Sequence, residues 1–377
     1  MTRYIHLRST VRLWSLLLLS LTSCIDPFEP EVNGVNVNFL VVDGFINASG
    51  VTTIKLTRTL NLQANTPPPV ESKATVYVEE ENGQRYRLTE SPAGTYTSPN
   101  LQLNVGKRHR LHFTTAASKE YFSDYTAVKL TPPIDKVTWT ADEGGVHLFV
   151  SAHDDANKTQ YYRWDYDETW EFTSQYRSYF EFVGGKMQYR TNNIWRCWTG
   201  QLGGFIRLST TTKLNQDVVA DYPLANLPSN STKLRYKYSV LVKQYAQTQE
   251  EFAYWEEMRK NTESIGTLFD PLPTQLVGNM HCATKPDELV LGYVGGYSVS
   301  EKRIFISRDE LPASWQFETG YKCGVPDTIQ FQYAALAFNN PNFLPIEMIE
   351  DVGYTGLTSD CVDCRKRGTN VAPSFWK

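Results

Sequence analysis

The chain has 377 residues and a formal net charge of −4 at pH 7. Its length exceeds that of one typical domain, so we expect two domains. This charge argues against a nucleic-acid-binding protein, because such proteins carry a basic stripe. Aromatic residues make up 13% of the chain and charged residues only 21%, and many aromatic residues and threonines favour strands over helices.

Residues 1–23 have the composition of a bacterial lipoprotein signal peptide. Three arginines precede the apolar core Leu13–Leu21, which is shorter than the roughly 20 residues that a membrane-spanning helix needs. The core ends in Leu-Thr-Ser followed by Cys24, and this arrangement resembles a lipobox. We therefore expect Cys24 to be acylated and to anchor the mature protein in the membrane. An ordinary secretory signal followed by a chance cysteine is the alternative.

Residues 24–37 are expected to form an extended tether between the lipid anchor and the first domain. Their prolines, glycine and acidic residues disfavour a helix. Acidic residues soon after a lipobox cysteine resemble the surface-export signal of lipoproteins from the Bacteroidota. We therefore expect an outer-membrane lipoprotein at the cell surface, with the periplasmic leaflet as the alternative location.

Residues 38–133 are expected to form a β-sandwich of the immunoglobulin or transthyretin type. Short segments of alternating apolar and polar residues follow one another here, and about seven strands fit this region. Two such segments flank Asn82-Gly83, a strong hairpin signal because both residues tolerate positive φ. The pair Pro132-Pro133 marks the domain boundary, since proline stops a strand.

Residues 134–377 are expected to form a larger β-rich domain. Its most informative strand is 161–172, with the sequence YYRWDYDETWEF. With a period of two, one face must be buried and is interrupted only by Glu168. Its aromatic residues are Tyr162, Trp164, Tyr166, Trp170 and Phe172. The opposite face carries a row of charges: Arg163, Asp165, Asp167 and Glu171. This row forms either a solvated surface or a cross-strand ion pair, or it is a face for a ligand or partner.

One helix is expected near residues 248–262, as a brace on the sheet. Thr248 is the candidate N-cap, and Glu251 three residues later completes the pattern of a capping box. Phe252, Trp255 and Met258 form an apolar stripe at helical spacing.

Five cysteines remain besides Cys24: Cys197, Cys282, Cys323, Cys361 and Cys364. A secreted protein meets an oxidising environment, so we expect two disulfides and one free thiol, with the connectivity left open. Cys361 and Cys364 stand in a C-x-x-C arrangement, and we expect each to bond to a different partner. A zinc site and a thioredoxin-like dithiol are the alternatives. Residues 360–377 would then be a structural tail, docked by its terminal aromatic residues.

The sequence contains no G-x-S-x-G, H-E-x-x-H, Walker A or G-x-G-x-x-G motif. It therefore indicates no catalytic residue, no metal site and no cofactor, and we expect a protein that is not an enzyme. A hydrolase or thiol enzyme whose catalytic residues are scattered in sequence is the alternative.

Several segments together resemble one family. After the lipobox these are, in chain order, TPPID, YYRWDYDETWEF, LFDPLPTQLVGNMH, LGYVGGYSVSEKRIF and CVDCRKRGTNVAPSFW. They are similar to a family of Bacteroidota outer-membrane lipoproteins catalogued as domain of unknown function 4249, and the closing Cys-x-x-Cys-Arg…Pro-x-Phe-Trp is the most specific part. The family has no established activity. The resemblance implies an accessory lipoprotein beside a TonB-dependent transporter, with a stand-alone adhesin or glycan- or protein-binding lipoprotein as the alternative.

Overall fold

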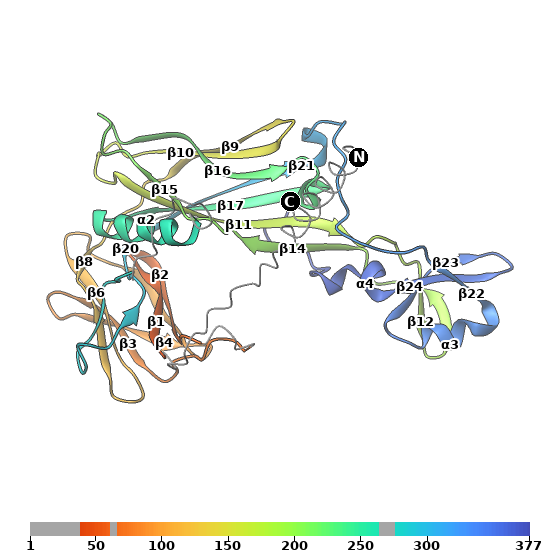
Figure 1. Cartoon of the computed structure of the whole chain (residues 1–377), viewed down its shortest axis with the longest axis horizontal. Coiled ribbons are helices and arrows are strands. Elements are labelled where there is room, and N and C mark those ends of the chain that lie inside the picture. Colours follow the sequence, from red (N-terminus) through yellow and green to blue (C-terminus); the bar gives the residue numbers. More distant parts are fainter. Residues whose placement is uncertain (1–37, 61–65, 264–275) are drawn as a thin grey trace, which may run out of the picture. The chain divides into compact units, whose positions relative to one another are not determined.

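The fold is given by a computed structural model that describes residues 38–60, 66–263 and 276–377. The described chain is mainly β, with one long helix, α2 (Gln249–Glu263) (Figure 1). This confirms the predicted fold class. None of the described helices is long and apolar enough to cross a membrane. The expected signal peptide, Cys24 and tether lie outside the described residues.

The N-terminal β-sandwich is built on an eleven-stranded sheet. Its first eight strands are β1 (Leu40–Asn47), β2 (Ser49–Arg58), β3 (Thr75–Glu80), β4 (Arg85–Glu90), β5 (Thr95–Gln102), β6 (Arg108–Thr114), β7 (Glu120–Ser123) and β8 (Thr126–Ala127). Apolar side chains from the middle and both ends of the strand order share one buried cluster, so the sheet folds around a single core. The predicted hairpin joins β3 to β4, and Gly83 adopts a φ of 93° there.

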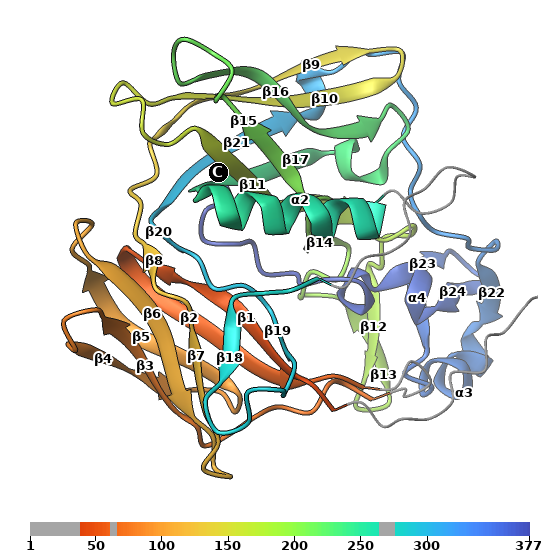
Figure 2. The same cartoon turned by 60° about the vertical axis from the view of Figure 1, so that its left-hand side comes forward.

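Three strands from late in the chain complete this sandwich. They are β18 (Met280–Cys282), β19 (Val290–Leu291) and β20 (Gly296–Tyr297). β18 pairs with β7, whereas β19 and β20 pair with β1 (Figure 2). The predicted domain boundary after Pro133 places these residues in the second domain instead. They lie in the first sheet because Met280, Val290 and Val294 are part of its core.

The central part of the chain forms two more sheets. One contains β9 (Ile134–Asp142), β10 (Gly145–His153) and β16 (Val218–Pro228). The other contains β11 (Tyr161–Thr173), β14 (Arg196–Leu202), β15 (Arg207–Thr210), β17 (Lys237–Ala246) and β21 (Val299–Ser307). The two sheets pack face to face (Figure 1). They share one core, to which Val150, Trp164 and Val240 belong.

The alternating pattern of β11 is confirmed. Tyr162, Trp164 and Tyr166 are buried in the shared core. Glu168 interrupts this apolar face and is only 5% exposed. Its carboxylate accepts hydrogen bonds from Tyr238 and from the side chain of Gln201, each at 2.8 Å, and pairs with the Lys233 ammonium at 2.7 Å. These donors offset the cost of burying the charge.

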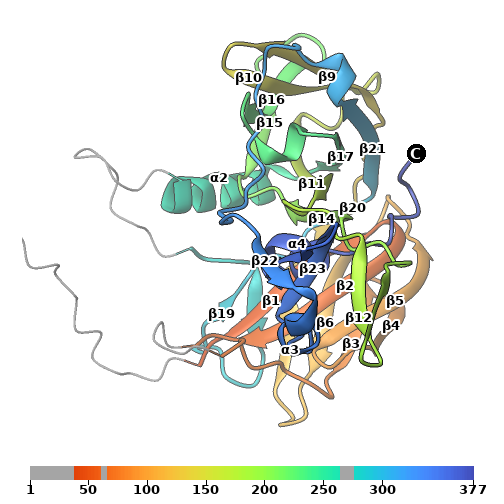
Figure 3. The same cartoon turned by 90° about the vertical axis from the view of Figure 1, so that its right-hand side faces the viewer.

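A hairpin from the middle of the chain and the C-terminal part together form a small subdomain (Figure 3). It contains the hairpin β12 (Phe180–Val183) and β13 (Lys186–Tyr189), and the sheet of β22 (Asp327–Gln330), β23 (Phe343–Ile349) and β24 (Gly353–Thr358). Short helices α3 (Ala334–Phe338) and α4 (Ser359–Val362) accompany these strands. The 3-10 helices of the described chain are η1 (Thr232–Leu234), η2 (Arg308–Glu310), η3 (Phe331–Tyr333) and η4 (Cys364–Lys366).

Two disulfides fix this subdomain and the tail. Cys364 bonds to Cys197 on β14, and Cys361 bonds to Cys323, while Cys282 is buried and free. The expectation of two bridges with different partners for Cys361 and Cys364 is confirmed. The alternatives of a zinc site and a redox dithiol at this C-x-x-C are wrong, because both sulfurs are bonded elsewhere.

The aromatic end of the tail docks on the central sheet. The Trp376 ring packs edge-on against Trp198, with ring centres 6.3 Å apart, and against Phe305 at 5.7 Å. The guanidinium of Arg303 lies 3.6 Å from the centre of the Phe375 ring. The tail is therefore held by ring packing as well as by the Cys197–Cys364 bond.

Candidate functional site

Helix α2 begins with the predicted cap, but its first-turn glutamate turns inward. The Thr248 hydroxyl accepts a hydrogen bond from the backbone N–H of Glu251 at 3.2 Å. The Glu251 carboxylate does not complete a capping box. It is 1% exposed, accepts a bond from the Trp255 indole at 3.4 Å and lies so close to Gly295 that a Cβ there would stand 2.2 Å from its Oε2. The sequence pattern missed this because a capping box and a buried acid share the same residue type.

Arg163 of β11 lies between two aromatic rings. Its guanidinium carbon is 4.3 Å from the centre of the Tyr245 ring on β17 and 4.3 Å from that of Trp255 on α2. Its Nη1 donates to both Asp165 oxygens, at 3.1 and 2.9 Å, and its Nη2 donates to the Tyr297 hydroxyl at 3.4 Å. Arg163 is 7% exposed. One cation therefore joins α2, the central sheet and the β20 strand of the first sandwich.

Burial sets the electrostatics around this arginine. Desolvation raises the pKa of Glu251 to about 7, even though Arg163 opposes the shift. Desolvation by itself would lower the pKa of Arg163, but Tyr297, Asp165 and neighbouring groups raise it on balance, so the arginine stays charged. Desolvation also raises the pKa of Tyr245 and Tyr297, so both hydroxyls stay protonated and can donate hydrogen bonds.

A cavity of about 710 Å³ opens beside Arg163. This is within the range of roughly 300–1,000 Å³ that is usual for small-molecule sites. We call it the ring cavity after the six aromatic side chains in its lining: Phe45, Tyr245, Tyr254, Trp255, Tyr293 and Tyr297. Arg163, Asp165 and Met258 also line it. Phe45 stacks on Tyr297 with ring centres 4.6 Å apart, which fixes this part of the wall.

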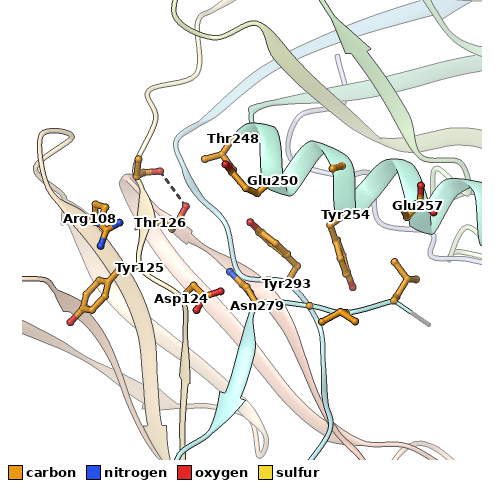
Figure 4. A pocket seen from close by; sticks show the side chains of 15 residues that line it. Arg108, Asp124, Tyr125, Thr126, Thr248, Glu250, Tyr254, Glu257, Asn279 and Tyr293 are labelled. Atoms are coloured by element: carbon orange, nitrogen blue, oxygen red, sulfur yellow. Dashed lines mark hydrogen bonds between the residues drawn. The ribbon is translucent and has the colours of Figure 1, made fainter. Parts of the chain in front are cut away.

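A second cavity, of about 640 Å³, borders the same helix (Figure 4). Tyr254 and Tyr293 line both cavities, and their rings lie 5.1 Å apart. The second cavity is more acidic. Its charged lining residues are Arg108, Asp124, Glu250 and Glu257, and in Figure 4 Glu250 and Glu257 project from α2. Asp124 pairs with His281 at 3.0 Å and Glu257 with Lys260 at 2.8 Å.

The predicted row of charges on β11 does not form one exposed face. Asp167 pairs with Lys243 of β17 at 2.7 Å, and Glu171, 5% exposed, pairs with Arg196 of β14 at 2.6 Å. Both are cross-strand ion pairs, one of the interpretations that the sequence allows for the charge row. Arg163 and Asp165 lie apart from them, at the ring cavity, because α2 covers that end of β11.

Most of the cavity wall was not predictable from the sequence pattern. Phe45, Tyr245 and Tyr293 stand in unremarkable strand or loop segments, and only the fold brings them to Arg163. One signal was available in the paired glycines Gly295 and Gly296 before Tyr297. A Cβ at Gly295 would overlap Glu251, and one at Gly296 would stand 3.2 Å from side-chain atoms of Thr126 and Val128. Among the described residues there is no group of three or more His, Cys, Asp or Glu side chains placed to hold a metal ion.

Two solved structures show distant similarity to this chain. A two-domain fibronectin type-III segment of chicken tenascin aligns at 8% identity, covering 55% of this chain and 90% of that one, with a TM-score of 0.17. A chain from the structure described as "Complete structure of manganese lipoxygenase of Gaeumannomyces graminis and partial structure of zonadhesin of Komagataella pastoris" aligns at 13% identity. It covers 58% of this chain and 91% of that one, with a TM-score of 0.17. TM-scores this low carry no argument about fold or function.

Comparison with curated proteins gives no significant match. A family model does match, and it covers residues 25–303, from the expected tether through β11, α2 and most of β21. The matched range includes every residue named above in the wall of the ring cavity. The chain belongs to the family described as "Domain of unknown function (DUF4249)".

Proposed function

We propose that the protein is a non-enzymatic lipoprotein of the outer membrane, anchored through acylated Cys24 at the cell surface. In this proposal it acts as an accessory, ligand-binding partner of a TonB-dependent transporter. The ring cavity is its binding site, and its ligand is cargo of the transporter.

The ring cavity is the observation that carries the binding role. Six aromatic side chains and one ion pair, between the buried Arg163 and the partly exposed Asp165, converge on it from four separate parts of the chain. Concave sites with mostly apolar walls and a few fixed polar groups are typical of ligand binding. The ion pair and the stacked rings hold the walls in place before any ligand arrives, which lowers the entropy cost of binding.

The membrane anchor and the transporter partner are supported by the sequence. The lipobox-like stretch ending in Cys24 supports acylation. The transporter partner is supported by the family to which the chain belongs, because its members resemble lipoproteins found beside TonB-dependent transporters. Two or more acyl chains would hold the protein stably, because each buried CH₂ contributes about 0.8 kcal/mol.

Purification from gently solubilised native membranes tests the partnership. An affinity tag inserted between Gly184 and Gly185 should be tolerated, since both glycines lie in the β12–β13 turn and a Cβ at either meets nothing within 4 Å. We expect a TonB-dependent barrel to co-purify, and we expect the tag on intact cells to be accessible to antibody.

The matched control replaces Cys24 by alanine, which should release the protein from the membrane and abolish recovery of the barrel. Recovery of the wild-type protein as a monomer without a barrel, on several growth substrates, would contradict the proposed partnership. Tag accessibility only after outer-membrane permeabilisation would place the protein in the periplasmic leaflet instead.

A further inference from the structure

We propose that the ring cavity binds a neutral sugar ring, with the Arg163–Asp165 pair holding its hydroxyl groups. This inference rests on the proposed binding function and specifies the chemical class of the ligand. It follows from the polar groups in the cavity, from their charge balance and from the rings around them.

The polar groups combine a buried cation with a partly exposed carboxylate. Arg163 lines the cavity and is 93% buried, and one of the two N–H groups of its Nη2 donates to the Tyr297 hydroxyl. The Asp165 side chain is 44% exposed, and a carboxylate offers about four acceptor positions, of which Nη1 of Arg163 occupies two. The pair therefore presents donors and acceptors side by side, and neighbouring sugar hydroxyls need both.

The charge balance disfavours an ionic ligand. Arg163 is compensated by Asp165 at 2.9 Å, and Asp43 also lines the cavity. An anionic ligand would approach two carboxylates. A cationic ligand would approach a guanidinium, and the second carboxylate, Asp43, is exposed to water and therefore offers only a weak counter-charge. Desolvating an ion without a free counter-charge is costly, whereas a neutral hydroxyl can use the existing pair as donor and acceptor.

The rings supply the apolar part of the recognition. Tyr254 and Tyr293 are partly exposed and form a tilted pair in the wall of the cavity. Aromatic faces bury the C–H surface of a ring-shaped ligand, and the phenol hydroxyls add hydrogen-bonding groups at the edge. Burial keeps the Tyr254 and Tyr293 hydroxyls protonated, since it raises the pKa of both groups. A sugar has this combination of an apolar face and a hydroxylated rim.

Titration of the full-length lipoprotein with defined sugars tests the inference. The protein is kept in a zwitterionic amine-oxide detergent, because maltoside detergents carry a sugar themselves. The neutral probes are glucose, galactose, mannose, N-acetylglucosamine, maltose and cellobiose, and the charged comparators are glucuronate and glucosamine. Calorimetry measures binding. We expect at least one neutral probe to bind saturably and more tightly than either charged comparator.

Two variants link binding to this cavity. Asp165→Asn and Tyr254→Ala should each weaken binding of the neutral sugar about tenfold or more, and thermal unfolding must show that both variants fold. Tyr189→Ala, at a ring that is 71% exposed on β13, is the matched control and should leave binding unchanged.

Three outcomes would overturn the sugar assignment: no binding of any neutral probe, tighter binding of a charged comparator, or unchanged binding in Asp165→Asn. The last outcome is decisive because Tyr254 lines both cavities, whereas Asp165 does not line the second one. If the barrel still co-purifies while no neutral sugar binds, the assignment fails and the proposed partnership stands. If sugars bind but no barrel is recovered, the sugar assignment stands and the partnership fails.

Discussion

Replacing Glu251 by glutamine tests whether this buried acid of α2 destabilises the fold at neutral pH. The carboxyl group is 1% exposed, and its Oε2 has no hydrogen-bond partner in the described part of the chain. Glutamine keeps the size of the side chain and removes only its titration. The substitution therefore isolates the energetic effect of one buried charge.

The size and sign of the effect follow from the pKa of this group. Desolvation raises the pKa of Glu251 from 4.5 to about 7. Between these two values the folded chain keeps the proton that the unfolded chain has released. The contribution of the carboxyl to stability is therefore full below pH 4.5, falls as the pH rises and is lost above pH 7. Over this interval the loss amounts to at most about 3 kcal/mol.

Urea unfolding of the wild type and of Glu251→Gln at pH 5, 6, 7 and 8 measures this loss. We expect the free energy of unfolding of the variant to rise relative to the wild type by about 1 kcal/mol per pH unit up to pH 7, and then to level off. Glu250→Gln is the matched control, because Glu250 is the preceding residue of the same helix and is exposed. Its difference from the wild type should not change with pH in this range.

A difference between Glu251→Gln and the wild type that stays constant from pH 5 to pH 8 would refute this reasoning. It would mean that Glu251 ionises in the folded protein as it does in the unfolded chain. The attraction of the Arg163 charge would then offset the desolvation of the carboxyl.

Three further outcomes are expected. Gly295→Ala should lower the free energy of unfolding in the same urea assay by about 1–3 kcal/mol, because the added Cβ overpacks against the buried glutamate of α2. Gly204→Ala is the control and should change this free energy little, since a Cβ there meets nothing within 4 Å. Equal effects of the two substitutions would contradict the predicted contact. Serine substitution at both Cys197 and Cys364 removes their disulfide and should lower the free energy of unfolding by about 5 kcal/mol, according to the chain-entropy model for a loop of 167 residues. Non-reducing peptide mapping that finds either sulfur free in the wild type would contradict the bond itself. Trp376→Ala should speed proteolysis of the C-terminal tail, because it removes the ring contacts with the central sheet. Mass spectrometry measures the rate of cleavage. An unchanged rate would show that the disulfides alone hold the tail.

Local patterns predicted the elements of this protein well. The alternation along β11 predicted which of its aromatic residues are buried, since side chains in a strand point to opposite faces in turn. Asn82-Gly83 predicted the β3–β4 hairpin, and Thr248 predicted the start of α2. Each of these features depends on residues within a few positions of one another.

The ring cavity could not be predicted in this way. Phe45 and Tyr297 are more than half the chain apart in sequence, yet they stack. Their contact exists because β20 pairs with β1, and nothing local in the segment around β20 indicates which sheet it joins. The inward turn of Glu251 is also a tertiary effect, because Gly295, which has no Cβ, leaves the space that the carboxyl occupies.

The sequence by itself determined the class of fold, the position of the long helix and the fact that the cysteines pair. It did so because burial, turn and capping preferences act over short distances along the chain. Only the tertiary structure decided which strands close the first sandwich, which cysteines bond and which charges of β11 are paired across strands. These outcomes depend on where each element finds a complementary apolar face, and that choice is made between segments distant in sequence. The ring cavity beside Arg163 is one of its results.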